Sequence, residues 1–126
     1  MRIVRSTETR RTATPAAVMT TLASPTLGGA ANPIWKVEAP AGQAGPLHHI
    51  DTEQVWTLLH GTATLALDTT TTELTEGDTV VIPAHAPRRF TPGPESGFIA
   101  IVTGPAPMHA YMPDDTDTRN PLPWAA

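Results

Sequence analysis

The sequence predicts an all-β protein, folded as an antiparallel sandwich or barrel. Short apolar or alternating segments recur through residues 34–103, and Gly, Pro or Asp residues bound them. Strands spaced about 8–12 residues apart, without long amphipathic helices between them, are typical of this architecture. A chain of 126 residues is large enough for one domain with a single hydrophobic core.

The first part of the chain predicts little regular structure. Residues 2–14 alternate weakly in polarity, which favours an outer strand or an extended arm. Thr14 and Pro15 suit the N-cap and the first position of a helix, so a short helical turn is expected through residues 16–19.

The middle of the chain carries the clearest strand signals. Residues 34–38 read Ile-Trp-Lys-Val-Glu, an alternation of apolar and polar side chains. Residues 54–59 and 62–67 are rich in β-branched, aromatic and aliphatic side chains. His60 and Gly61 separate these two segments, so they predict the turn of a β-hairpin.

Three further strands are predicted before the C-terminal region. Residues 79–82 form a short apolar run that Pro83 ends, and residues 88–91 and 98–103 follow across a turn rich in Gly and Pro. Residues 104–126 hold five of the fourteen prolines and show no periodicity. They predict a tail that lies across the barrel.

Composition excludes several classes of function. The net charge of −4 and the pI near 5.6 argue against nucleic acid as a partner. The absence of Cys excludes disulfides and thiolate metal sites and suits a reducing cytoplasm. No apolar run approaches the roughly 18–20 residues that span a bilayer. We therefore expect a cytoplasmic protein without nucleic-acid or membrane partners.

Two glycine-bounded spacings resemble the signature motifs of the cupin family, G(x)5HxH(x)3-4E(x)6G and G(x)5PxG(x)2H. The first motif falls on Gly42, His48, Ile50, Gln54 and Gly61, and the second on Gly77, Pro83 and Arg88. The resemblance implies a double-stranded β-helix, or jelly-roll barrel, with a pocket at one mouth. The divisions expected on this basis are an N-terminal arm (1–33), a core (about 34–103) and a C-terminal tail (104–126), all within one domain (1–126).

The resemblance fails at the metal ligands. In the family, three His and one Glu bind the metal, whereas this chain places His48, Ile50, Gln54 and Arg88 at those four positions. Ile50 has no donor atom, and Arg88 is a permanent cation where a metal needs a lone pair. We therefore expect a pocket without a metal cofactor. The alternative is a divalent metal such as zinc, held by His48 with His49 or His85.

Strand alternation suggests which side chains share the pocket. On an extended strand His48, Ile50, Gln54 and Trp56 lie on one face, and His49 lies on the other. We expect His48 to face the pocket as a proton carrier, unless it only bonds backbone at the rim. Trp56, Ile50 and His85 are the expected ligand-binding residues, although Trp56 also suits plain core and His85 also suits a solvated turn.

Arg88 and Gln54 complete the predicted catalytic set. Arg88 would stabilise negative charge on a ligand through its planar fork, unless it pairs with a nearby acid. Gln54 would orient the ligand, unless it merely satisfies Arg88 or His48.

Three functions follow from these residues. The first is a pocket that binds a small anionic or enolisable molecule and moves protons, as in isomerisation, cyclisation or dehydration. The second, by resemblance to small polyketide cyclases, is a zinc-assisted cupin cyclase. The third is a non-catalytic ligand-binding protein. Family analogy also suggests a homodimer.

Overall fold

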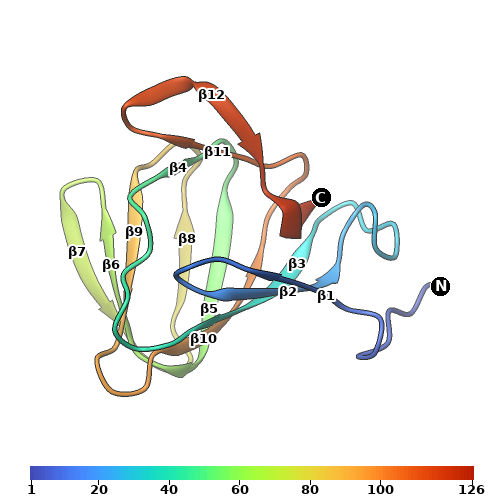
Figure 1. Ribbon diagram of the computed structural model, residues 1–126, viewed down its shortest axis with the longest axis horizontal. Helices are drawn as coiled ribbons and strands as arrows, with labels where there is room; N and C mark the ends of the chain where they lie inside the picture. The colour runs from blue at the N-terminus through green and yellow to red at the C-terminus, as the bar shows by residue number, and fades with distance from the viewer.

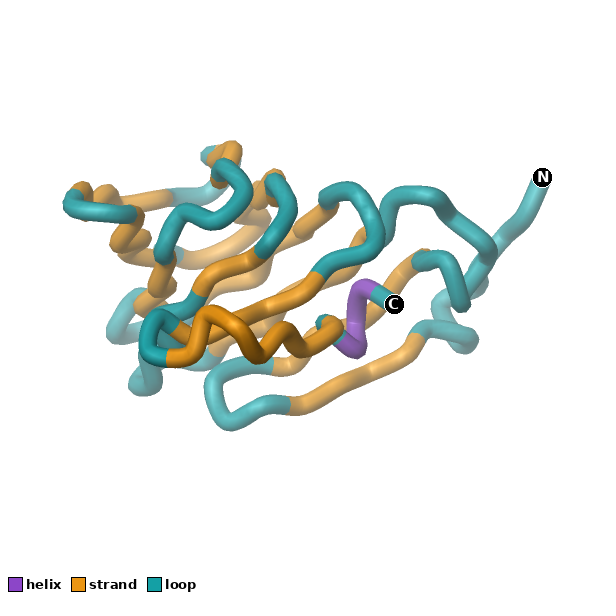
Figure 2. The backbone as a smooth tube through the Cα atoms, turned by 90° about the horizontal axis from the view of Figure 1, so that it is seen from above, coloured by secondary structure: helices purple, strands orange, loops and turns teal.

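The computed structural model describes residues 1–126 as a β-barrel with one short helical turn near the C-terminus (Figures 1 and 2). The elements are β1 (Arg10–Ala13), β2 (Val18–Ala23), β3 (Ile34–Ala39), β4 (His49–Ile50), β5 (Gln54–Gly61), β6 (Ala63–Leu67), β7 (Thr70–Leu74), β8 (Thr79–Ile82), β9 (Arg88–Pro92), β10 (Phe98–Thr103), β11 (His109–Met112), β12 (Asp115–Pro121) and the 3-10 turn η1 (Pro123–Ala125). The predicted all-β jelly roll is confirmed. No helix has the length and hydropathy needed to cross a membrane.

Three antiparallel sheets form the barrel wall. A six-stranded sheet runs in the order β1-β2-β3-β10-β5-β8, and two three-stranded sheets run β7-β6-β9 and β12-β11-β4. Backbone hydrogen bonds between His48 and Arg88, 3.1 and 2.9 Å long, join the chain before β4 to β9. The β11–β12 hairpin lies across the top of the barrel in Figure 1.

Side-chain alternation on the strands builds the core. Trp35, Val37 and Ala39 on β3 are buried, and so are Phe98, Ala100 and Val102 on the paired strand β10. The residues between them face outward, because successive side chains of a strand point to opposite faces. The predicted strands at residues 34–38, 79–82 and 98–103 are confirmed almost to the residue.

The helical turn predicted after Thr14 is wrong. Residues 14–17 form the turn of a hairpin, because Ala13 on β1 pairs with Val18 on β2. The Thr14 hydroxyl accepts a bond from the backbone N–H of Ala17 (3.1 Å), and the Thr14 N–H donates to the Ala17 carbonyl (2.9 Å). Thr and Pro serve turns as readily as helix starts, and strand pairing decides between them here.

The hairpin predicted at His60-Gly61 is also wrong. Strand β5 pairs with β10 and β8, whereas β6 pairs with β7 and β9, so the chain crosses between sheets at Gly61. Gly61 has a φ of +76°, and a Cβ there would collide with the carbonyl oxygen of Gly97. Glycine is required by this close approach of two chain segments.

The tail contains more structure than the sequence predicted. It forms β11, β12 and η1, and Met108, Tyr111 and Leu122 are buried. Every residue of β12 is exposed, so the strand shows no alternation in its sequence. Pairing of β11 with both β12 and β4 fixes the tail on the barrel.

Candidate functional site

A cavity of about 530 Å³ occupies the interior of the barrel. Its wall is mostly apolar and includes a group of aromatic rings: Trp56 stacks on Phe90 with ring centroids 4.1 Å apart, and Phe98 lies 6.4 Å from Trp56 at an edge-on angle. Trp35 adds a further ring. The volume falls within the range of small-molecule sites, which are mostly apolar with few polar groups.

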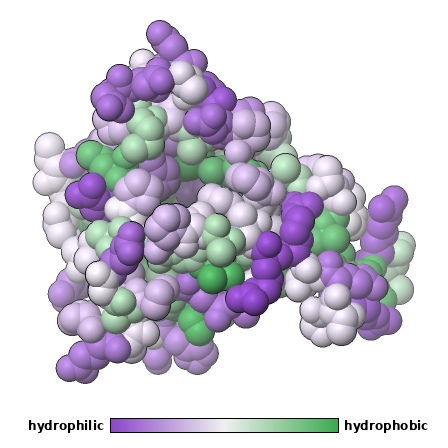
Figure 3. All heavy atoms as spheres, in the orientation of Figure 1, coloured by the Kyte–Doolittle hydropathy of each residue, from purple (hydrophilic) through white to green (hydrophobic).

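The segments that close the cavity come from both ends of the chain and from one loop before β4. The turn at residues 14–17 lines it, as does the loop at 43–46, and the tail contributes Trp124 and Leu122. The Thr21 hydroxyl fixes the tail by donating to the Trp124 carbonyl (2.8 Å). The sequence predicts that the tail lies across the barrel, but not that the tail and the turn at residues 14–17 line a cavity, because contacts across about 100 residues leave no local pattern. In Figure 3 hydrophobic residues gather across the middle of the face seen in Figure 1, and hydrophilic ones cover its upper edge.

His48 is the only ionisable side chain that lines the cavity. Its Nδ1 lies 2.8 Å from the Pro46 carbonyl, which can only accept a hydrogen bond, so the proton resides on Nδ1 and the Nε2 lone pair remains free. Burial lowers the pKa of His48 below its ordinary 6.5, and the nearby Arg88 and His49 charges lower it further, against the hydrogen bond to Pro46. His48 is therefore a neutral base at pH 7.

Arg88 is fully buried beneath this histidine. Its guanidinium donates to the Ala86 carbonyl (Nε, 3.1 Å), the Pro83 carbonyl (Nη2, 3.2 Å) and Gln54 Oε1 (Nη1, 3.2 Å). None of the ion pairs in the structure includes Arg88. Burial lowers the pKa of Arg88 to about 10, partly offset by Tyr111, so the group stays charged at neutral pH. It is a buried cation without a counter-charge.

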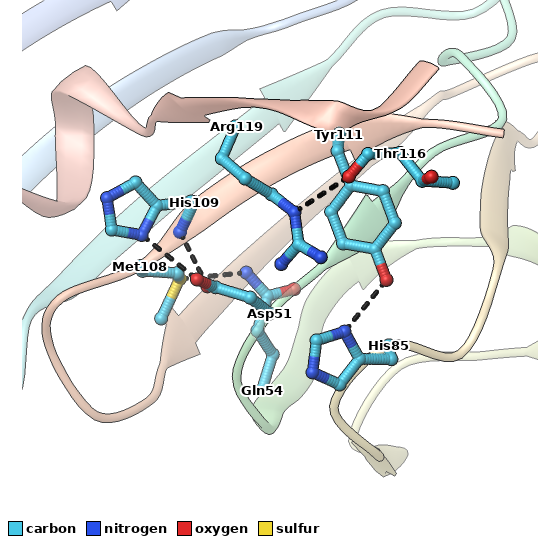
Figure 4. Close-up of polar contacts among 8 residues, drawn as sticks. All are labelled: Asp51, Gln54, His85, Met108, His109, Tyr111, Thr116 and Arg119. Atoms are coloured by element: carbon cyan, nitrogen blue, oxygen red, sulfur yellow. Dashed lines mark hydrogen bonds and ion pairs between the residues drawn. The ribbon is translucent and has the colours of Figure 1, made fainter. Parts of the chain in front are cut away.

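Gln54 connects Arg88 to the cavity wall. Its Oε1 accepts from Arg88 and from Trp56 Nε1 (3.0 Å), and its Nε2 donates to the sulfur of Met108 (3.2 Å). Figure 4 shows the Gln54 amide directed toward Met108. Every polar atom of this buried side chain has a partner, and Gln54 does not line the cavity. Its placement suits the positioning of Trp56 and Arg88.

His48 and Arg88 lie side by side. Their backbones pair directly, and paired residues on neighbouring strands present side chains to the same face. Arg89, the next residue, is exposed on the outer face. The arrangement places a neutral base at the cavity and a fixed positive charge beside it, a combination suited to a ligand that carries or develops negative charge.

The other predicted site residues lie away from the cavity. Ile50 is 1% exposed in the core, and His85 sits on an exposed turn. His85 has a φ of +68°, and its Nδ1 bonds the Tyr111 hydroxyl at 2.7 Å (Figure 4). His49 Nδ1 donates to the His85 carbonyl (2.7 Å), and its ring stacks on Tyr111 at 4.6 Å. The glycine usual at the His85 position in the motif is explained by the left-handed backbone there.

The side chains present do not fit a metal at the motif position. No three His, Cys, Asp or Glu residues converge anywhere in the structure. The guanidinium of Arg88 donates three hydrogen bonds where a ligand would have to offer lone pairs. His48 lines the cavity, whereas His49 and His85 lie outside it and contact Tyr111, so His48 does not share the cavity with either of them.

The lowered pKa of His48 predicts a loss of stability in acid. Below pH 6.5 the unfolded chain binds a proton at this residue more readily than the folded chain does, so the free energy of unfolding falls as pH drops through 6.5 and levels off below the folded pKa. Urea unfolding between pH 7.5 and 5 should show a shallower pH dependence for His48→Gln than for the wild type. His60→Gln, at an exposed site, should keep the wild-type slope; equal slopes for all three would contradict the assignment.

Comparison with known families gives one match over the middle of the chain. The cupin domain family matches residues 35–102, which run from β3 to β10 and include both motifs. No curated protein matches the chain.

Solved structures with the same fold come from several bacteria. A cupin-2 domain protein from Rhodospirillum rubrum has a TM-score of 0.77 at 15% identity, over 90% of this chain and 80% of its own. A cupin 2 domain-containing protein from Halorhodospira halophila has a TM-score of 0.73 at 22% identity, over 79% and 71%. The polyketide cyclase RemF from Streptomyces resistomycificus has a TM-score of 0.71 at 23% identity, over 86% and 83%. At these identities the likeness establishes the fold alone.

Proposed function

This chain belongs to the cupin family, and on that premise we propose that its barrel cavity binds a flat, mostly apolar, acidic or enolisable organic molecule and moves protons on it without a metal. The observation that carries the proposal is the pairing of His48, the one ionisable group on an apolar cavity wall, with the uncompensated cation of Arg88.

Ligand shape follows from the wall. The stacked rings of Trp56 and Phe90, with Phe98 beside them, favour a planar ligand that stacks in turn. The apolar lining leaves few groups to bind several hydroxyls or phosphates, so a conjugated ring compound suits the cavity better than a sugar phosphate.

The expected charge of the ligand follows from Arg88 and His48. A buried positive charge without a counter-ion is costly, and an anion within its field repays part of that cost. Neutral His48 adds no competing positive charge at pH 7, and its Nε2 accepts a hydrogen bond or a proton. A carboxylate, phenolate or enolate meets these requirements.

The chemistry is proton transfer at a carbon next to a carbonyl. His48 Nε2 takes the proton, the C–H electron pair passes into the enolate, and the field of Arg88 stabilises the oxygen that gains the charge. The imidazolium then returns the proton. Return to another carbon isomerises the ligand, protonation of a leaving hydroxyl dehydrates it, and attack of the enolate on a second carbonyl closes a ring. Gln54 acts as a positioning residue for Arg88 and Trp56.

Binding without catalysis is the second candidate. It is favoured by the three side-chain hydrogen bonds of Arg88, all of which end on groups inside the protein. A zinc-assisted cyclase, suggested by the likeness to RemF, lacks support from the donor set.

Ligand binding is tested by tryptophan fluorescence, because all three Trp residues of the chain line the cavity. Titration with 2-naphthoate is expected to give a saturable change with one site per chain. The matched cation, 2-naphthylmethylammonium, has the same rings and should bind at least tenfold more weakly, because of Arg88. Equal affinities for the two probes, or no saturable change with either, would contradict the proposal.

A further inference from the structure

A second hollow lies directly behind one wall of the barrel cavity. It is a surface groove of about 460 Å³, between the tail and the loop near Pro25 and Ala31. Leu122 is the one residue that lines both the groove and the cavity. Leu122, which is 7% exposed, therefore lies between the two spaces.

The residue that the two spaces share belongs to the tail. Other residues of the tail divide between the two spaces. Ala110 and Trp124 line the cavity, whereas Met108 and Ala125 line the groove. Met108 also accepts the bond from Gln54, on the barrel side (Figure 4).

The backbone of the wall is held independently of the Leu122 side chain. The backbone N–H of Leu122 donates to the Met108 carbonyl (3.1 Å), and the Leu122 carbonyl accepts from the N–H of Ala125 (3.1 Å). Thr21 holds the neighbouring Trp124 carbonyl. A shorter side chain at position 122 would thus open a passage without removing the hydrogen bonds that fix the wall.

We propose that Leu122 determines the length of ligand that the cavity accepts, an inference that rests on the proposed ligand-binding function. The ligand lies with its acidic end near His48, and its far end stops against Leu122. The groove beyond offers apolar surface, with His109 as its only ionisable side chain. His109 Nδ1 is held by Asp51 Oδ2 at 2.9 Å (Figure 4). A ligand that passed Leu122 would therefore need an apolar alkyl or aryl tail.

A homologous series of 4-alkylbenzoates, from methyl to octyl, tests this proposal by tryptophan fluorescence. In the wild type the affinity should rise about fourfold with each methylene that enters the cavity and then stop rising at a defined chain length. In Leu122→Ala the rise should continue for several more methylenes, because the tail now enters the groove. Met19→Ala, which enlarges the cavity on another wall, should move the limit by about one methylene at most.

A second substitution with the opposite expected effect keeps the proposal testable if Leu122→Ala does not fold. Leu122→Phe should shorten the limit by one or more methylenes, and filling the groove with Ala31→Trp should cancel the gain in Leu122→Ala. If the wild type binds short alkylbenzoates but neither Leu122 variant moves the limit, the length proposal is wrong and the binding function stands. If the wild type binds no member of the series, both are wrong.

Discussion

Replacing Arg88 with Ala is expected to weaken 2-naphthoate binding at least tenfold. Two unit charges about 8 Å apart, at an effective dielectric constant of about 20, attract each other by about 2 kcal/mol. Arg88 is buried and has no carboxylate partner to cancel its field. Neutral 2-naphthol, which has the same ring system, should lose much less affinity. Fluorescence titration of both ligands against wild type and variant gives the comparison.

Two further substitutions separate charge from structure. Arg88→Lys should recover only part of the affinity, because a compact ammonium group cannot span the three separate acceptors that the guanidinium reaches. Arg89→Ala, one residue along on the exposed face of β9, should change little. Equal losses at Arg88 and Arg89, or equal losses for 2-naphthoate and 2-naphthol, would mean that Arg88 serves only the fold.

Replacing His48 with Gln is expected to have the largest effect on proton transfer. The probe is 2-tetralone, an enolisable ketone fused to a benzene ring, whose α-protons exchange with D2O in a way that NMR follows. Loss of a general base typically costs about 100-fold to 10,000-fold in rate. The wild-type rate should also fall as pH drops, with a midpoint below 6.5, because protonation removes the free lone pair of His48.

The control for this experiment is His60→Gln, whose side chain is 71% exposed and outside the cavity. It should exchange 2-tetralone protons at the wild-type rate. If His48→Gln still binds 2-naphthoate and exchanges at the wild-type rate, His48 is not the base. If the wild type exchanges 2-tetralone no faster than buffer does, the protein is a binding protein.

The sequence predicted the strands that carry their own signal. Residues 79–82 and 98–103 are apolar runs between turn residues, and each forms a strand with those bounds. The sequence does not predict which strands pair, because a glycine marks a change of chain direction and does not identify the partner strand. The sequence around Gly61 therefore predicts a hairpin turn, whereas in the structure the chain passes from one sheet to another at this residue.

The candidate site was predictable only in part. Spacing placed His48, Gln54 and Arg88 near one another, and the structure brings them together. The partners of Arg88 are mostly backbone carbonyls, which no residue pattern reveals. The closure of the cavity by Trp124 depends on β11 and β12, and the fully exposed β12 has no alternation to find.

Titration of metal-free protein decides whether the cavity binds its ligand without a metal. Protein purified without added metal and dialysed against a chelator should contain well under one metal ion per chain. It should bind 2-naphthoate with one site, and added zinc should leave the affinity unchanged. A stoichiometric metal that survives the chelator, or binding that appears only with zinc, would contradict the account.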